Sequence, residues 1–341
     1  MKVILERKRY NRGMIKKEKK IIISVVLLLF FGLSLTWVLW KPSGSVAMSD
    51  RPAIDESGYL AENIVRDSST GKYWWVFSDR NVMGIRMASS PDLMHWEVEN
   101  NLLIEDSPVD SVCIRRFGGI YYLFYSKCFG EGNRRGNLWM CSSSKVNGNF
   151  SSSQLVLDVG KLGDWDDNRV SEPDLVWKDG RYYLFFMGED SKDYEKIGYA
   201  VSVSPSGPFV KYINNPVLSG SDLYRLKWNS GHDRAADPDI FQIEEGYIIQ
   251  HTACKTSKEN WSIGWAFTKD FITFKVMEDP ILTASSWAGG AVSRGGLIQV
   301  KDKYYMSFAG YDSATMKYGK CGLVEIKNFE ELKNKLLLSD R

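Results

Sequence analysis

The sequence predicts an all-β fold, a five-bladed β-propeller, preceded by one N-terminal transmembrane helix. A hairpin pattern that occurs five times and the strand patterns that follow its copies predict the propeller. The pattern is clearest at Ser171–Phe186, where an acidic stretch, a short apolar strand, an Asp-Gly turn and an aromatic strand follow one another. An Asp-Gly pair between apolar strands is the strongest short signal for a β-hairpin. An uncharged run over residues 21–40 predicts the helix.

The other four copies follow at intervals of roughly 50–65 residues, near the length of a propeller blade. They are Glu62–Phe77, Asp110–Tyr125, Asp237–Ile249 and Gly295–Phe308. Third-strand patterns recur after them, for example Gly84–Ser90, Ile197–Ser202 and Ile263–Thr268. One four-stranded sheet cannot bury its faces alone, whereas five sheets packed around an axis can. Residues 58–341 are therefore expected to form one propeller, with a short surface helix near residues 328–336.

The N-terminal segment predicts a membrane anchor. An uncharged run of about 20 residues is long enough to cross a bilayer. Nine Lys and Arg precede it against two Glu, so the positive-inside rule places residues 1–20 in the cytoplasm. Residues 21–40 are then a signal anchor, residues 41–57 a linker, and the propeller an extracytoplasmic domain of a single-pass protein of the cell membrane. A cleaved signal peptide with a weak site at Ser45-Val46-Ala47 is the alternative.

Composition narrows the function classes. The whole chain has a net charge of +2, and because its tail is strongly basic the remainder is mildly acidic, which argues against a nucleic-acid partner. The five Cys lack zinc or redox spacing, so we expect buried thiols, with a Cys128–Cys141 bridge as the alternative. No nucleotide-binding loop, zinc motif or nucleophile elbow is present. We expect no cofactor and no metal, except for an optional structural ion in the central channel.

Acidic residues stand at the start of the predicted inner strands, which line the channel of a propeller. Aligning the copies on their aromatic strands places Glu172, Asp237 and Arg294 at equivalent positions, with Asp110 one residue off. Carboxylates gathered around a sugar-sized cavity are what glycoside hydrolysis requires, one protonated as the acid and one ionised as the base. Burial and mutual repulsion would raise the pKa of one of them.

The repeated phrases resemble those of the five-bladed propeller glycoside hydrolases of families 43, 62, 32 and 68, and family 43 in particular. They are Ser171–Leu175, Lys178–Leu184, Asp92–Glu97 and Ser204–Phe209. The resemblance covers essentially all of residues 58–341. It implies that Glu172 is the general acid and that Asp110 is the carboxylate that tunes it. It also implies that Arg294 binds substrate or orients a carboxylate.

The chain departs from the family pattern in the first blade. In the family, an Asp on the first blade acts as the base or nucleophile. That Asp should stand near Ala61, but the chain reads Ala61-Glu62-Asn63. Glu62 replaces it if the strand is shifted by one residue. Asp50 or Asp55 could also enter from the linker, or the base could be absent. Asp237 would take over catalysis, bind substrate, or only form an Asx-type turn before Pro238.

The aromatic and basic residues nearby complete the expected site. The candidate substrate-binding residues are Arg294, His232, Trp177 and Arg234. The expected partner is an oligo- or polysaccharide, cleaved by carboxylate acid/base catalysis. The alternatives are a non-catalytic carbohydrate-binding propeller with a degenerate site, and a family 130-like phosphorylase that would use Arg294, Arg234 and His232 for phosphate. The stereochemistry depends on the separation of acid and base, roughly 6.5–9.5 Å for inversion and 5–5.5 Å for retention.

Overall fold

The computed structural model describes residues 45–104, 108–130, 135–220, 234–254, 261–312 and 319–338. The predicted cytoplasmic tail, the predicted membrane span and His232 lie outside these ranges. Within them, no helix has both the length and the apolar character needed to cross a membrane. In the same ranges, the secondary-structure elements are strands, apart from helix α3 (Phe329–Leu338) near the C-terminus.

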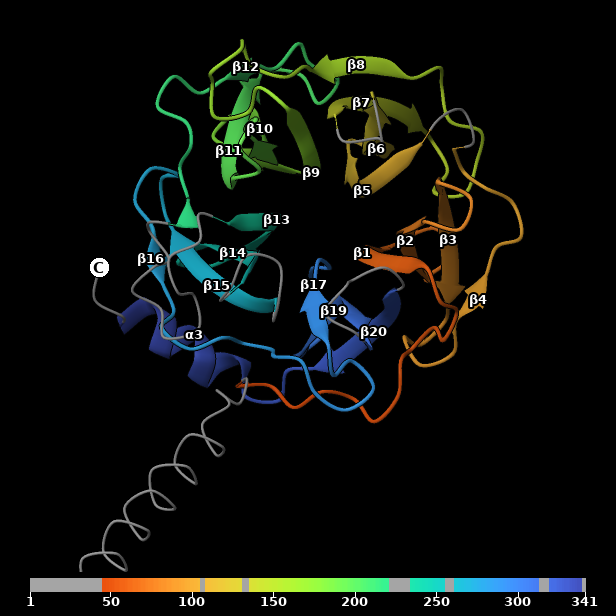
Figure 1. The fold of residues 1–341 in the computed structure, drawn as a ribbon. Coiled ribbons are helices and arrows are strands. Elements are labelled where there is room, and N and C mark those ends of the chain that lie inside the picture. The colour runs from red at the N-terminus through yellow and green to blue at the C-terminus, as the bar shows by residue number, and fades with distance from the viewer. Residues whose placement is uncertain are drawn as a thin grey trace, which may run out of the picture. The chain divides into compact units, whose positions relative to one another are not determined.

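The strands form antiparallel blades arranged in chain order around an axis, as Figure 1 shows. The first blade contains β1 (Tyr59–Arg66), β2 (Tyr73–Asp79), β3 (Gly84–Ser90) and β4 (Glu97–Val98). The second contains β5 (Val109–Phe117), β6 (Ile120–Phe129), β7 (Arg135–Ser143) and β8 (Gln154–Leu157). The third contains β9 (Arg169–Lys178), β10 (Arg181–Glu189), β11 (Glu195–Ser202) and β12 (Val210–Lys211). One parallel bridge, Gly136 to Arg169, joins the second and third blades into a single eight-stranded sheet.

The last two blades follow the same order. The fourth contains β13 (Ala235–Ile243), β14 (Gly246–Ala253), β15 (Ser262–Thr268) and β16 (Lys275–Val276). The fifth contains β17 (Ala291–Ser293), β18 (Leu297–Val300), β19 (Lys303–Tyr311) and β20 (Gly319–Glu325). Both β17 and β18 pair with β19, so together they are the inner strand of this blade. The predicted all-β propeller is confirmed, and the described part of the chain forms five blades.

A β-bulge interrupts every inner strand at the same place. In β1, Ala61 pairs with Phe77 and Ile64 with Trp75, so two residues lie opposite one. Equivalent register shifts occur in β5, β9 and β13, and a break separates β17 from β18. The residues at these positions are Glu62, Asp110, Glu172, Asp237 and Arg294. A bulge bends its strand and redirects a side chain, which explains how each blade presents one charged residue at the axis.

The backbone of three of these residues is left-handed. The φ angles are 54° at Glu172, 53° at Asp237 and 59° at Arg294. Such angles are uncommon for residues other than glycine and cluster at functional sites. The shared angle confirms the equivalence of these three positions. Asp110 also occupies the bulge position of its blade, so the sequence alignment that set it one residue off was wrong.

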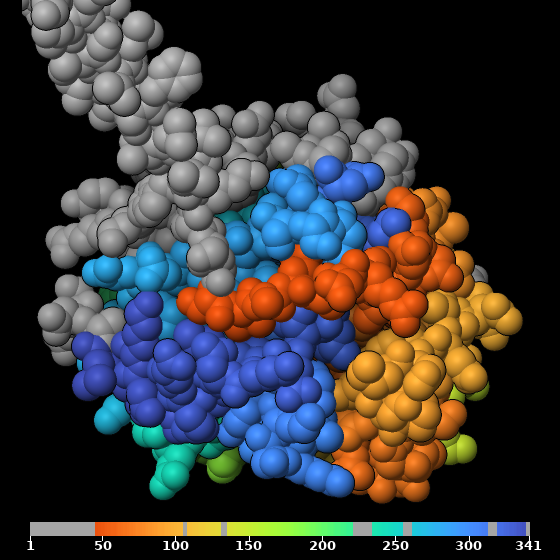
Figure 2. Space-filling model, turned by 90° about the horizontal axis from the view of Figure 1, so that it is seen from below, coloured from red at the N-terminus to blue at the C-terminus, as the bar shows by residue number. Residues whose placement is uncertain are grey.

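The described part of the predicted linker, residues 45–57, lies along the propeller. The Val46 N–H donates to the carbonyl of Ile281 at 2.9 Å, and the Ala53 and Ile54 N–H groups donate to the carbonyl of Cys321. Ile54 thereby forms a bridge at the outer edge of β20. Figure 2 shows this segment crossing the surface beside the C-terminal part of the chain. The beginning and the end of the propeller are joined here, which closes the ring of blades.

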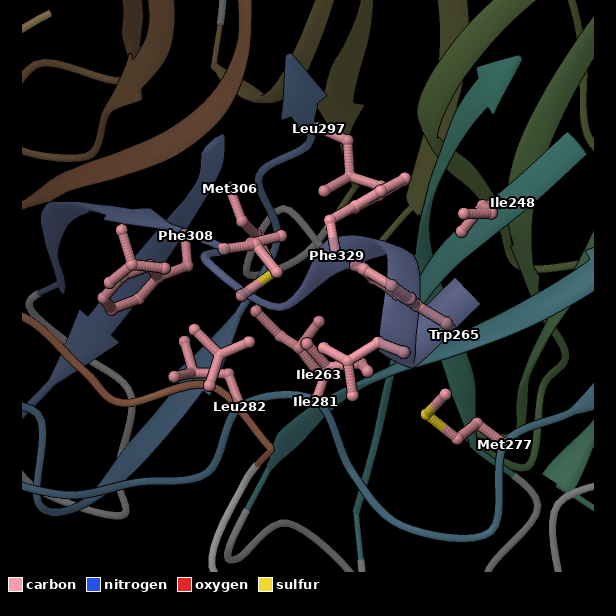
Figure 3. Close-up of a cluster of buried hydrophobic side chains, with 14 of the residues drawn as sticks. Ile248, Ile263, Trp265, Met277, Ile281, Leu282, Leu297, Met306, Phe308 and Phe329 are labelled. Atoms are coloured by element: carbon pink, nitrogen blue, oxygen red, sulfur yellow. The ribbon is translucent and has the colours of Figure 1, made fainter. Parts of the chain in front are cut away.

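Apolar side chains between the blades form the core. The cluster in Figure 3 joins the fourth and fifth blades to α3, with Trp265, Met306 and Phe308 all buried. Helix α3 buries Phe329, Leu332 and Leu336 against it, which confirms the predicted C-terminal helix. Burying a large apolar side chain stabilises a fold by about 1.5–3 kcal/mol, so the inner strands have a rigid support.

The five cysteines are buried, and none of them forms a disulfide. They lie in or beside strands, at positions 113, 128, 141, 254 and 321. Cys141 pairs with Leu123 in the sheet and Cys128 pairs with Gly136, so the strand register keeps the two apart. The expected buried thiols are confirmed, and the alternative Cys128–Cys141 bridge does not form.

Candidate active site

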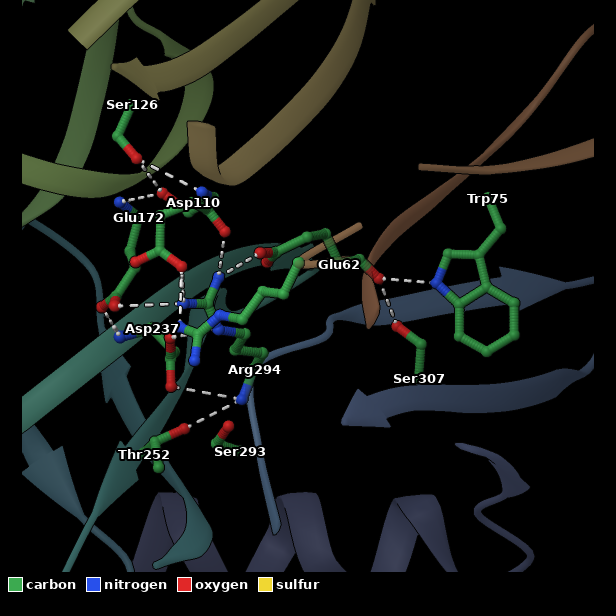
Figure 4. A network of polar contacts seen from close by, with 12 residues as sticks. Glu62, Trp75, Asp110, Ser126, Glu172, Asp237, Thr252, Ser293, Arg294 and Ser307 are labelled. Carbon is green, nitrogen blue, oxygen red and sulfur yellow. Dashed lines mark hydrogen bonds and ion pairs between the residues drawn. The ribbon is translucent and has the colours of Figure 1, made fainter. Parts of the chain in front are cut away.

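Arg294 lies at the centre of a ring of carboxylates at the axis (Figure 4). Its Nη1 is 2.6 Å from Glu62 Oε1 and also donates to the carbonyl of Asp110 at 3.0 Å. Its Nη2 is 3.3 Å from Asp110 Oδ1 and 3.9 Å from Glu172 Oε1. Its Nε is 3.8 Å from Asp237 Oδ1. One buried guanidinium therefore reaches carboxylates from the other four blades.

Asp110 is held in its ionised form. Its Oδ1 accepts a hydrogen bond from Arg80 Nη2 at 2.7 Å, and its Oδ2 binds Arg169. Burial alone would raise the pKa of this carboxyl, but Arg80, Arg294 and Arg169 outweigh that effect and hold the pKa well below its ordinary range. A carboxylate fixed in this way cannot donate a proton, but its field can influence the groups around it.

Glu172 is kept protonated. Burial and the nearby Asp237 raise its pKa well above the ordinary range, although Arg294 opposes them. Its Oε2 accepts a hydrogen bond from the Asp237 backbone N–H at 2.8 Å, and its own N–H donates to Ser111 Oγ at 2.8 Å. These bonds fix the carboxyl in position. A buried, oriented and protonated carboxyl has the properties of a general acid.

Glu62, and not Ala61, occupies the bulge position of the first blade. Ala61 is fully buried in strand pairing, whereas Glu62, at the bulge, reaches Arg294. Burial raises the pKa of Glu62 to about 8, with smaller contributions from Asp237 and Asp110, against the attraction of Arg294. Asp50 is exposed, and Asp55 pairs with Lys320 at the surface. Among the linker and first-blade candidates, only Glu62 is brought to the ring.

The raised pKa of Glu62 predicts a pH-dependent stability. Because its pKa rises from 4.5 to about 8 on folding, the stabilisation from its proton is complete below pH 4.5 and is lost as the pH rises through about 8. We therefore expect the free energy of unfolding to fall between pH 5 and 8, by up to about 1.4 kcal/mol per unit. Denaturant titrations at several pH values should show a smaller slope for Glu62→Gln than for the wild type.

The matched control for this slope is Glu330→Gln. Glu330 lies on α3, where its side chain is 62% exposed beside Lys333. It should leave the slope unchanged. Equal slopes for the wild type and Glu62→Gln would contradict the raised pKa of Glu62.

The other predicted residues have different positions. Asp237 lies in the ring, where its Oδ2 accepts a hydrogen bond from the Arg294 N–H at 3.2 Å. Arg234, just before β13, pairs with Asp193 at 2.7 Å and Glu195 at 2.9 Å. Trp177 is half exposed near the hairpin end of β9, five residues beyond Glu172, and is not brought to the ring.

Three charged residues at the site were missed in the sequence. Arg80 follows β2, Arg169 begins β9, and Glu195 begins β11, where burial raises its pKa to about 7. In the stretch before β9, Asp166 is buried beside Lys211, and Arg169 at the start of β9 reaches Asp110. The signal for a buried charged cluster here was the acidic pair Asp166-Asp167, which stands just before β9. Arg80 and Glu195 follow no repeated pattern.

The ring adjoins a small cavity of about 10 Å³, which Glu62, Glu172 and Asp237 line together with residues such as Asn63 and Asp174. This is room for about one water molecule. In the described ranges, no group of three or more His, Cys, Asp or Glu is arranged to hold a metal ion. Carboxylates and guanidinium groups are the charged groups that the ring brings together.

The fold places this chain in the class of five-bladed propellers typified by family 43 glycoside hydrolases and related enzymes, and the predicted resemblance is confirmed. No family model matches the chain. It is 33% identical to a xylosidase/arabinosidase of Bacteroides ovatus over 86 residues, which are 25% of this chain and 26% of the relative. It is 44% identical to xylosidase/arabinosidase 43A of Humicola insolens over 55 residues, 16% of each chain. These matches span about a quarter of the first relative and a sixth of the second.

A solved thermostable family 43 glycoside hydrolase has a similar structure. The TM-score is 0.60 at 14% identity, with 84% of this chain and 91% of that chain covered. At this identity the likeness concerns the fold alone. The reaction and the substrate are therefore inferred from the side chains of the site.

Proposed function

We propose that this protein is a glycoside hydrolase in which Glu172 is the general acid and Glu62 the general base. The observation that carries the proposal is the gathering of Glu62, Asp110 and Glu172 around one buried arginine, where the pKa of Glu172 is raised and the pKa of Asp110 is lowered. Glycoside hydrolysis needs a proton donor and an ionised carboxylate together, and separated pKa values are the usual sign of such roles.

The proposed reaction uses each group once. Glu172 gives its proton to the glycosidic oxygen as the bond from that oxygen to the anomeric carbon breaks. Ionised Glu62 takes a proton from a water whose oxygen bonds to the same carbon. Ionised Asp110 stabilises the positive charge that develops on the sugar, and Arg294 holds both carboxyls in place. The hemiacetal and the free alcohol leave, with one water consumed.

We propose that the reaction inverts the anomeric centre. Glu62 and Glu172 contact different terminal nitrogens of Arg294, at 2.6 and 3.9 Å, so they are separate carboxyls on either side of one guanidinium group. A gap for a water between acid and base is the inverting arrangement, at roughly 6.5–9.5 Å. The names of the two relatives suggest arabinose- or xylose-containing oligosaccharides as the first substrates to test.

The test uses the full-length protein with aryl α-L-arabinofuranosides, aryl β-D-xylosides and arabinan- and xylan-derived oligosaccharides. Hydrolysis would be followed by product release, and the first anomer formed would be identified by NMR. We expect cleavage with inversion. Absence of cleavage across a broad glycoside panel, in a protein that still binds the oligosaccharides, would favour the second candidate function.

That second candidate is a non-catalytic carbohydrate-binding propeller. Glu62 supports it, because a base with a pKa of about 8 that is paired with Arg294 at 2.6 Å is largely unavailable at neutral pH. In the hydrolase, activity should therefore rise with pH as Glu62 ionises. In the binding protein, only affinity would be measurable.

We also propose that the propeller acts outside the cytoplasm on a retained anchor at residues 21–40. The support is the uncharged run and the basic residues that precede it. Protease added to intact cells should remove the propeller while a membrane-bound N-terminal fragment remains. Complete protection of the propeller would contradict this location.

A further inference from the structure

The charges of the site are divided between two sides. Arg294 lies within 3.9 Å of Glu62, Glu172 and Asp237, so the carboxylates gather around it. On the other side, Arg80 and Arg169 both bind a single carboxylate, Asp110. Among the described residues, neither arginine has another acidic partner within 4 Å. The wall formed by Arg80, Asp110 and Arg169, the cationic wall, therefore carries one positive charge in excess.

Arg80 has hydrogen-bond donors to spare. Its side chain is 34% exposed, against 6% for Arg294 and 16% for Arg169. Within the described chain, Arg80 uses only Nη2, which donates to Asp110 Oδ1. Arg169 points a buried Nε–H at no acceptor in that part of the structure. A guanidinium presents five donors in a planar fork that fits a carboxylate, so the cationic wall has free donors suited to a planar anion.

We propose that the substrate is a sugar bearing a carboxylate, a uronic acid unit, and that Arg80 in the cationic wall recognises that carboxylate. The inference rests on the proposed function, because it assumes that a sugar ring lies beside Glu172. Among the described residues, Arg80 shares its carboxylate partner with Arg169 and Arg294, so an anionic substituent that balances the wall binds favourably.

The same division of charge fixes the orientation of the sugar. A carboxylate placed toward Asp237 would meet like charge, whereas one placed toward Arg80 meets the excess cation. The uronate group therefore points to the cationic wall. Its glycosidic bond is left facing Glu172. Arg80 is a specificity-determining residue in this arrangement, and a neutral sugar gains nothing from it.

The experiment measures binding in the full-length Glu172→Gln protein by calorimetry, so that no result depends on turnover. The probes are digalacturonate and its neutral counterpart galactobiose, together with xylo-oligosaccharides with and without a glucuronate branch. In at least one pair we expect the uronate to bind about tenfold to a hundredfold more tightly, as for one charged hydrogen-bonded pair. The ratio of affinities should shrink as salt is raised from about 50 to about 500 mM, because salt screens the attraction between the uronate and the arginine.

Variants of the arginines identify the source of that ratio. Arg80→Met, added to Glu172→Gln, should reduce the ratio to below about threefold, and Arg80→Lys should keep an intermediate ratio because the charge remains without the fork. The matched control is Arg116→Met, since Arg116 is exposed and contacts Ser68 and the Tyr121 ring, far along the strand from Asp110. It should retain the full ratio. Circular dichroism and thermal unfolding would show that each variant is folded.

Three outcomes would overturn the proposal, and a fourth would support it. Equal affinity for every neutral and uronate pair overturns it, as does an unchanged ratio in folded Arg80→Met. Inorganic phosphate that competes for the site and yields a sugar phosphate in the wild type also overturns it, because the cationic wall would then serve a phosphate co-substrate. A uronate preference without hydrolysis by the wild type supports this inference and rejects the hydrolase, so the two failures are distinguishable.

Discussion

Glu172→Gln is expected to lower kcat/KM for unactivated oligosaccharides by about 10²–10⁴-fold, the usual contribution of a general acid. Glutamine keeps the size of the side chain and can still accept the hydrogen bond that the Asp237 N–H now gives to Oε2. It has no acidic proton for the leaving oxygen. The loss should therefore appear mainly in kcat, with KM changed little, in steady-state assays on the substrates that the wild type cleaves.

The leaving group distinguishes a missing acid from a distorted site. Aryl glycosides with very acidic phenols leave without a proton, so Glu172→Gln should retain much more activity on a dinitrophenyl glycoside than on an oligosaccharide. Glu325→Gln is the control, because Glu325 pairs with Lys303 at the surface. An equal loss on all leaving groups would indicate a structural effect. Unchanged activity would reject Glu172 as the acid.

The equivalence of Glu172, Asp237 and Arg294 could be predicted because the repeats themselves carry the register. Glu172 and Asp237 both stand before a Pro-Asp pair, and an aromatic or apolar strand follows at a similar distance. Proline cannot donate to the ladder and is found at bulges, so the phrase marks the irregular point of the strand. Asp110 is followed by Ser111, not by proline, and its bulge became visible only in the strand pairing.

The remaining partners of the site could not be predicted, because they depend on contacts far apart in the chain. Arg80 and Arg169 reach Asp110 from the end of β2 and the start of β9, on either side of the second blade. No repeat places them there. Trp177 shows the opposite case. Its repeated motif predicts the strand, but its position near the hairpin end of β9 keeps it away from the ring. A strand rises about 3.3 Å per residue, so five residues carry Trp177 well away from Glu172.

Arg294→Met is expected to destabilise the fold by about 3–5 kcal/mol, the cost of leaving buried charges without their partner. Methionine fills much of the same volume but offers no donor to Glu62, and none to the nearby Asp110, Glu172 and Asp237. Denaturant unfolding at fixed pH would measure the loss. Arg294→Lys keeps one charge and should lose less. Arg116→Met, an exposed arginine, should lose almost nothing.

The pH dependence of this variant tests the cause of the loss. In the wild type, burial already raises the pKa of Glu62 to about 8, and Arg294 opposes that rise. Without Arg294, the pKa values of Glu62 and Glu172 should rise further. A larger part of the free energy of unfolding then requires that both carboxyls are protonated. That stability is present at low pH and is lost as the pH rises. The stability of Arg294→Met should therefore differ least from that of the wild type at about pH 5 and most at about pH 8, the two ends of the range in which these carboxyls titrate. A loss independent of pH would show that packing, not buried charge, is what Arg294 supplies.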